Sequence, residues 1–113
     1  MKKILTAVFL LFSSSAFAAV ESGYRNIEDI GCHLNDRICF ATLSGIPVGP
    51  VGCSHVSIRW ETRVSDIGAK NGNAILSMLM AAHAAGRQVN FGVSEACFGP
   101  QPAFPTFIYL RVK

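Results

Sequence analysis

Four cysteines constrain the fold of this chain more than any other feature of its sequence. They are Cys32, Cys39, Cys53 and Cys97, and all of them follow a leader-like segment at residues 1–18. An even number of cysteines in a small exported chain is typical of disulfides. A zinc site is disfavoured, because no two cysteines have the C-x-x-C spacing and their intervals are long and irregular. We therefore expect two disulfides and no metal site.

Three pairings of these cysteines are open. A two-residue turn at Asn35-Asp36 would place Cys32 directly opposite Cys39 across a hairpin. This favours Cys32–Cys39 together with Cys53–Cys97, and the main alternative is Cys39–Cys53 together with Cys32–Cys97. In either arrangement the bridge to Cys97 closes a long loop, which should raise the free energy of unfolding by about 3–5 kcal/mol.

Residues 1–18 have the three parts of a secretory signal peptide. Two lysines follow the first residue, residues 4–12 are apolar, and Ala16-Phe17-Ala18 is a small-x-small cleavage site. The apolar run is shorter than the roughly 20 residues that a membrane span needs. We expect cleavage near Ala18, a single domain at residues 19–113, a secreted or periplasmic location, and no membrane span.

The charge of the mature chain disfavours nucleic acid as a partner. Without Lys2 and Lys3, eight basic residues face seven acidic ones, so the net charge falls from +3 to +1. The arginines are scattered and form no basic stripe. Catalysis is not expected either, because no serine stands in a G-x-S-x-G motif and paired cysteines leave no thiol nucleophile. The three histidines lack an informative metal-ligand spacing, and we expect no cofactor.

Hydrophobic periodicity predicts a mainly β chain with one helix. The predicted strands are residues 27–34, 38–43, 54–63, 87–94 and 107–112, and the predicted helix is residues 73–86. The order β-β-β-α-β-β is that of a five-stranded OB-type Greek-key barrel, in which the helix plugs one end. A small α+β sheet with the helix across one face is the alternative. Residues 19–26 are either an entry segment or a first edge strand.

The predicted helix carries no charged residue on the face opposite its core stripe. Asn71 or Asn73 would cap its start, and Gly86 would close its end. The core stripe consists of Ile75, Leu79 and Ala82. The back of the helix consists of Ser77, Ala81, Ala84 and Ala85. Two interpretations are open: the helix is buried on all sides within a small domain, or its small residues let a second copy of the chain approach closely.

Six residues are candidates for ligand binding. They are His55, Ser57, Arg59, Tyr24, Phe98 and Phe104. The first three share the polar side of the predicted strand at 54–63, which is suited to a sugar or a partner but is also typical of a solvated strand face. The two phenylalanines stand in a proline-rich loop, which holds apolar side chains outward at low entropic cost. Trp60 lies on the apolar side of the strand and is expected in the core.

Several segments resemble one family of toxin subunits. They are Ile38-Cys39-Phe40-Ala41-Thr42-Leu43, Gly52-Cys53-Ser54, the helix with its Gly86-Arg87-Gln88-Val89 exit, and Ala96-Cys97-Phe98-Gly99-Pro100. Together they resemble the B subunits of subtilase-cytotoxin and pertussis-like toxins, and a wider group of small exported bacterial proteins of unknown role. The resemblance implies an OB-type barrel, a pentameric ring with the helices around a pore, recognition of surface glycans, and an enzymatic A subunit as partner. The chain departs from these subunits at residues 24–29, where their serine-containing sialic-acid segment is not matched.

The sequence therefore predicts an exported binding module that recognises glycans as a homo-oligomer. The alternative is an exported protein with a structural or protein-interaction role that works as a monomer. The mass of the purified protein and its response to a panel of glycans separate the two.

Overall fold

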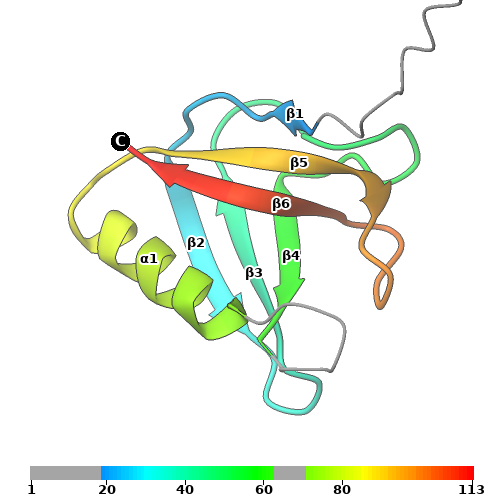
Figure 1. Ribbon diagram of the computed structural model, residues 1–113, viewed down its shortest axis with the longest axis horizontal. Coiled ribbons are helices and arrows are strands. Elements are labelled where there is room, and N and C mark those ends of the chain that lie inside the picture. Colours follow the sequence, from blue (N-terminus) through cyan, green and yellow to red (C-terminus); the bar gives the residue numbers. More distant parts are fainter. Residues whose placement is uncertain (1–18, 63–70) are drawn as a thin grey trace, which may run out of the picture.

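The computed structural model describes residues 19–62 and 71–113, so the predicted signal peptide lies outside the described part. Over these residues the chain is mainly β with one helix, as predicted. The elements are β1 (Val20–Glu21), β2 (Ile27–Cys32), β3 (Ile38–Leu43), β4 (Ser57–Glu61), α1 (Gly72–Ala84), β5 (Val89–Cys97) and β6 (Pro105–Val112). They form two three-stranded antiparallel sheets, with the orders β1-β5-β6 and β2-β3-β4. Strands β5 and β6 run across β2, β3 and β4 (Figure 1).

The predicted closed barrel of five strands is not what the described residues form. Residues 20 and 21 add a sixth strand, β1, which pairs with β5 and confirms the edge-strand interpretation of this segment. Strands β4 and β6 are neighbours in space, but they belong to separate sheets within the described residues. Side chains fill the space between them, and the rings of Trp60 and Phe107 meet edge to face with centroids 5.7 Å apart. Aromatic packing takes the place of a hydrogen-bonded ladder here.

The favoured cysteine pairing is confirmed. Cys32 and Cys39 are direct partners in the β2-β3 register and form one disulfide. The second disulfide joins Cys53 to Cys97, which are 44 residues apart in sequence. The register of a hairpin is fixed by its turn and by the alternation of its strands, which is why the sequence could predict the first bridge.

The turn of this hairpin is wider than the predicted Asn35-Asp36 turn. The last bond before the turn runs from the His33 N–H to the Ile38 carbonyl oxygen, at 2.8 Å. Arg37 adopts a left-handed backbone with a φ of 57°. The Asp36 carboxylate accepts a hydrogen bond of 3.1 Å from the Ile38 N–H and so supports the wider loop. A short acidic side chain that bonds the backbone two residues on is typical of such turns.

Helix α1 begins with a tight packing contact. Asn71, one of the two predicted caps, occupies the cap position, but its side chain does not make the predicted capping bond, and Asn73 lies inside the helix. Instead, Gly72 packs against the end of β4, where an added Cβ would lie 2.2 Å from the Glu61 carbonyl oxygen. The Gly72 carbonyl oxygen also accepts a 3.0 Å bond from the indole N–H of Trp60. A glycine is required here because a side chain would collide with backbone atoms.

The end of α1 agrees with the sequence prediction. Gly86 has a φ of 65°, the left-handed conformation that closes many helices. Its N–H donates to the His83 carbonyl oxygen at 3.2 Å, and the Arg87 N–H donates to the Ala82 carbonyl oxygen at 2.9 Å. These two bonds satisfy carbonyl groups of the last turn and direct the chain into β5.

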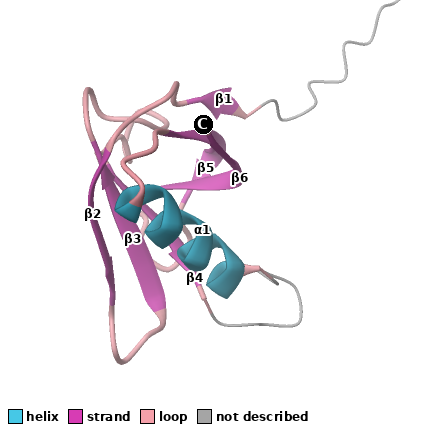
Figure 2. Ribbon diagram, turned by 90° about the vertical axis from the view of Figure 1, so that its left-hand side faces the viewer, coloured by secondary structure: helices cyan, strands magenta, loops and turns pink. Residues whose placement is uncertain are grey.

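The hydrophobic core lies between the two sheets and α1. From the helix, Leu79 and Ala82 are buried and Ile75 is half-buried, which confirms the predicted core stripe. The fully buried side chains around them include those of Phe91, Leu43, Ile58 and Val89, and Trp60 is buried as expected. The helix lies beside β2 (Figures 1 and 2). Among residues 19–62 and 71–113, no helix has the length and hydrophobicity to cross a membrane.

Candidate ligand-binding sites

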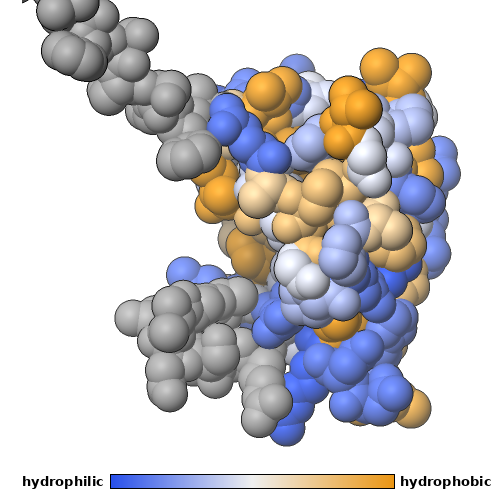
Figure 3. Space-filling model, turned by 90° about the vertical axis from the view of Figure 1, so that its right-hand side faces the viewer, coloured by the Kyte–Doolittle hydropathy of each residue, from blue (hydrophilic) through white to orange (hydrophobic). Residues whose placement is uncertain are grey.

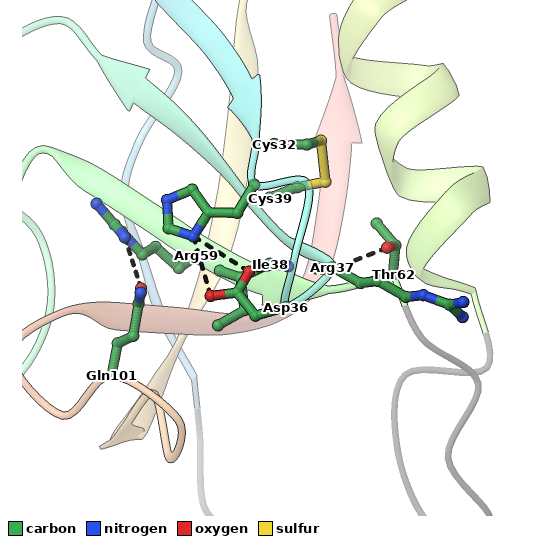
Figure 4. A network of polar contacts seen from close by, with 9 residues as sticks. Cys32, Asp36, Arg37, Ile38, Cys39, Arg59, Thr62 and Gln101 are labelled. Atoms are coloured by element: carbon green, nitrogen blue, oxygen red, sulfur yellow. Dashed lines mark hydrogen bonds and ion pairs between the residues drawn. A yellow bond between two sulfur atoms is a disulfide. The ribbon is translucent and has the colours of Figure 1, made fainter.

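An arginine lies midway along β4, an edge strand, on the outer face of the β2-β3-β4 sheet. Arg59 of β4 is opposite Phe40 of β3, and its Cζ lies 5.2 Å from the centroid of that ring. The ring of Phe104 stacks more closely, with its centroid 3.5 Å from Cζ. The Nη1 of Arg59 donates a 2.5 Å hydrogen bond to the side-chain oxygen of Gln101, which points at the guanidinium from the loop at 98–104 (Figure 4). We call Phe40, Arg59, Gln101 and Phe104 the arginine cluster.

Three of the six predicted ligand-binding residues come together here. Besides Arg59 and Phe104, the exposed ring of His55 lies against Phe104, with centroids 4.9 Å apart. The Nδ1 of His55 accepts a 2.9 Å bond from the Ser57 N–H, which orients the imidazole. The residues of the predicted polar patch thus do share one place on the surface, although their contacts are with one another.

The expectation that Ser57 faces solvent is wrong, and Phe98 does not extend outward from its loop. Each is only 6% exposed. The reason is that the loop at 98–104 folds back over the sheet. The Phe98 N–H donates to the Phe104 carbonyl oxygen at 2.9 Å, and further bonds join Gln101 to both phenylalanines. The Cys53–Cys97 disulfide fixes the start of this loop. The sequence pattern of β4 correctly grouped its polar residues but did not reveal this cover.

Tyr24 lies outside the arginine cluster. Its ring is partly exposed and faces Lys113, whose Nζ is 5.2 Å from the ring centroid. Tyr24 therefore shares no site with His55 or Arg59, and any ligand that it binds would lie at a different place on the surface.

The surroundings of Arg59 and Asp36 shift the pKa values of both side chains. Partial burial lowers the pKa of Arg59, and the nearby negative charge of Asp36 opposes that change. The pKa of Asp36 is itself lowered, first by the hydrogen bond from the Ile38 N–H and then by the bond to His33 (Figure 4). Asp36 is an exposed carboxylate with partners of its own, so it acts on Arg59 through space and not by contact.

A cleft of about 420 Å³ lies between β1, the 44–50 loop and β5, and no motif in the sequence indicates it. It is lined by Val20, Glu21, Ser22, Arg25, residues 46–50, Val93, Ser94 and Glu95. These residues come from three separate stretches of the sequence, 20–25, 46–50 and 93–95, so no local pattern could have grouped them. We call it the Arg25 cleft. Figure 3 looks onto the end of the molecule that carries this loop, where hydrophobic and hydrophilic groups mix in the upper half.

Arg25 holds the walls of this cleft together. Its Nε donates to the Ser22 carbonyl oxygen at 2.9 Å, and its Nη1 donates to the carbonyl oxygens of Ser44 and Ile46 at 2.8 and 2.9 Å. The side chain thus fixes the glycine- and proline-containing loop against the segment between β1 and β2. A loop with two carbonyl groups tied to a guanidinium that also bonds the Ser22 carbonyl oxygen is pre-organised for binding, because less conformational entropy is lost on contact.

Two carboxylates, those of Glu21 and Glu95, line the same cleft. Glu21 accepts a 2.9 Å bond from the Tyr109 hydroxyl and lies 3.5 Å from Arg111. The bond from Tyr109 lowers the pKa of Glu21, with Asn90 and Arg111 acting in the same direction, and it raises the pKa of Tyr109. Glu21 therefore stays ionised at neutral pH and can accept hydrogen bonds at the cleft.

The predicted oligomer-interface residues are all solvent-exposed on a single chain. They are Ser77, Ala81, Ala84 and Ala85, and two exposed methionines, Met78 and Met80, stand on either side of them. The interpretation that one domain buries the helix on all sides is therefore wrong. An exposed helix face without charged residues remains, as the second interpretation requires.

Within the described residues, no group of three or more histidine, cysteine, aspartate or glutamate side chains is placed to hold a metal ion. All four cysteines are paired, so none is available as a nucleophile. Taken together, the two disulfides, the two sheets and the open cleft define a small disulfide-bonded β protein with a concave surface site. Comparison with protein-family models, with characterised proteins and with solved structures finds no match to this chain.

Proposed function

We propose that this protein is an exported carbohydrate-binding module that acts as a homo-oligomer. The Arg25 cleft is the observation that carries the proposal, because it is concave, has apolar walls and presents a few polar groups from a fixed loop. Such a combination is typical of small-molecule sites. The arginine cluster is less suited to a sugar in its present form, since Nη1 of Arg59 is bonded to Gln101 and the rings of Phe40 and Phe104 lie against the guanidinium.

The charge of the cleft favours a neutral sugar. Glu95 contributes one negative charge and Glu21 another, which Arg111 partly offsets from 3.5 Å, whereas the guanidinium of Arg25 already donates to three carbonyl groups. A carboxylate or sulfate on the sugar would be repelled more than attracted. Hydroxyl groups, by contrast, can donate to both carboxylates, while Ile46 and Val20 offer apolar contact to the C–H face of a ring.

Self-association through α1 belongs to the same proposal. The exposed back of the helix is uncharged, as the core of an interface tends to be, and its small side chains would let a second copy approach closely. The resemblance to toxin B subunits supports a pentameric ring, an OB-type relation between the two sheets and an enzymatic A subunit as further partner. The two disulfides are compatible with a secreted or periplasmic location after cleavage near Ala18.

A glycan array with two matched variants tests the proposal. Ile46→Asp adds a negative charge to a cleft residue that is 74% exposed, so the fold should survive while binding of neutral glycans falls about tenfold or more. Val51→Asp is the control, because Val51 directly follows the 44–50 loop, is 102% exposed and does not line the cleft. Equal binding by both variants, or no binding of any glycan by the wild type, would contradict the proposal.

A second candidate function is a protein-interaction role for an exported monomer. The observation in its favour is a groove between α1 and β2, lined on the helix side by Leu76, Met80 and His83. Flexible methionine side chains are common on surfaces that bind proteins. This candidate predicts a monomer that binds no glycan and whose Ile46→Asp variant behaves like the wild type.

A further inference from the structure

Two buried polar atoms on the outer face of β4 have no hydrogen-bond partner among the described residues. They are Oγ of Ser57 and Nε of Arg59. Residues two apart in a strand point to the same face, so both atoms lie on the face where Gln101 and Phe104 of the 98–104 loop contact Arg59. A buried donor without a partner costs free energy, and the cost is greater when the group is charged. A partner that approaches this face would therefore be stabilised by both.

Arg59 is also without a carboxylate contact. No ion pair involves it within residues 19–62 and 71–113, and its one side-chain hydrogen bond goes to the neutral amide of Gln101. The negative charge of Asp36 acts on Arg59, but the Asp36 carboxylate is bonded to His33 and to the Ile38 N–H. Meanwhile the rings of Phe40 and Phe104 hold the guanidinium in place. A guanidinium that is held by aromatic rings and has unused N–H groups is suited to a planar or tetrahedral oxyanion, which it can bind through two parallel bonds.

We propose that the arginine cluster is the closed form of an oxyanion-binding site, in which the Gln101 side-chain oxygen occupies the position of an oxygen of a bound carboxylate, sulfate or phosphate. Binding would displace Gln101, expose Nε of Arg59 and bring the anion within reach of the Ser57 hydroxyl. The loop at 98–104 is braced by its own backbone bonds and held at Cys97 by the disulfide, so it can lift as a unit. This site is separate from the sugar cleft and does not depend on it.

The direct test is an NMR titration of the full mature chain that follows the Nε–H resonance of Arg59. Sulfate, phosphate and acetate are added in turn, and Arg37, which is exposed, serves as the internal reference for non-specific binding. We expect Arg59 to shift and saturate with at least one anion while Arg37 shifts only linearly. No saturable shift of Arg59 with any of the three anions would overturn the proposal.

Two variants of one residue sharpen the test. Gln101→Ala removes the competing amide and should tighten anion binding about tenfold, because a hydrogen bond to a charged group no longer has to be broken. Gln101→Glu supplies an internal carboxylate and should abolish binding while the chain stays folded. If Gln101→Glu binds anions as well as the wild type, the proposal is wrong, even if Arg59 titrates.

The three anions also identify the source of the natural ligand. Preference for acetate would indicate a carboxylate, preference for sulfate a sulfated glycan, and preference for phosphate a phosphorylated molecule. The Ile46→Asp variant should bind the preferred anion as the wild type does, since Ile46 lies in the Arg25 cleft. Failure of the sugar proposal and failure of the anion proposal are therefore distinguishable.

Discussion

The outer face of the β2-β3-β4 sheet and the outer face of α1 differ in solvent exposure. The difference is opposite to what the polarity of their side chains suggests. The sheet face carries polar residues such as Ser57 and Arg59, yet the loop at 98–104 covers it. The helix face carries alanines and no charged residue between Ala74 and Ala84 apart from the titratable His83, yet it is open to solvent. A single chain thus covers its polar face and leaves its uncharged face bare.

This difference teaches that side-chain polarity shows which residues share a face but not what lies over that face. The cover of the sheet comes from a segment about 40 residues away, as the separation of 42 residues between Arg59 and Gln101 shows. For α1, no described segment serves as a cover. Under the proposed self-association a second copy of the chain would supply that cover, and the following predictions test the contrast.

The largest effect should come from the disulfide that anchors the cover of the sheet. Replacing Cys53 and Cys97 together by serine opens a loop with a sequence separation of 44 and should lower the free energy of unfolding by about 4 kcal/mol. The same change at Cys32 and Cys39, separated by 7, should cost about 2.5 kcal/mol. Denaturant titrations of both double variants measure the two losses in free energy of unfolding. A larger loss for the Cys32 and Cys39 variant would contradict the assignment of the longer bridge as the main constraint.

A smaller loss of stability is expected when the loop at 98–104 loses its aromatic contact with Arg59. Phe104→Ala removes a ring that stacks on the guanidinium and on His55, which should lower the free energy of unfolding by about 2 kcal/mol. Leu34→Ala is a control, because Leu34 is fully exposed. Chemical denaturation of both variants is sufficient, and equal stability would mean that the loop at 98–104 does not cover the sheet in solution.

A change on the helix face should barely affect the fold. Ala81→Glu places a charge on an exposed position, so the stability of one chain should change by less than about 0.5 kcal/mol. The charge should nevertheless dissociate the oligomer, because it would be buried between copies without a partner. Ala81→Ser keeps the residue small and uncharged and should leave the assembly intact. Light scattering reports the mass, and circular dichroism confirms the fold of each variant.

The smallest effect concerns the turn beside the arginine cluster. The lowered pKa of Asp36 means that its charged form contributes stability above the unfolded value of about 3.9, and that this contribution is lost as the pH falls through the folded pKa. Asp36→Asn should therefore reduce the fall in melting temperature that accompanies acidification in this range. If the melting temperatures of the variant and the wild type fall equally with decreasing pH, the bonds from the Ile38 N–H and to His33 do not form in solution.

Features set by neighbours in sequence could be predicted. The Cys32–Cys39 pair follows from hairpin register, the closure of α1 at Gly86 follows from glycine's access to a positive φ, and the core stripe through Leu79 follows from helical periodicity. Each depends on contacts over a few residues or on one repeating pattern.

Features set by distant segments could not be predicted. The Arg25 cleft is assembled from β1, the 44–50 loop and β5, and Arg25 reveals its role only through bonds to the Ser44 and Ile46 carbonyl oxygens. The burial of Ser57 likewise depends on a loop that alternation within β4 cannot indicate. The separation into two sheets has the same origin, because it depends on how β4 and β6 meet.

The mass of the mature protein in solution, measured by light scattering over a wide concentration range, tests most directly whether another chain covers α1. The account predicts a stable mass several times that of one chain, and five times that mass if the ring implied by the toxin resemblance forms. A mass of one chain at every concentration would show that the uncharged face of the helix tolerates water unaided, and would contradict the account.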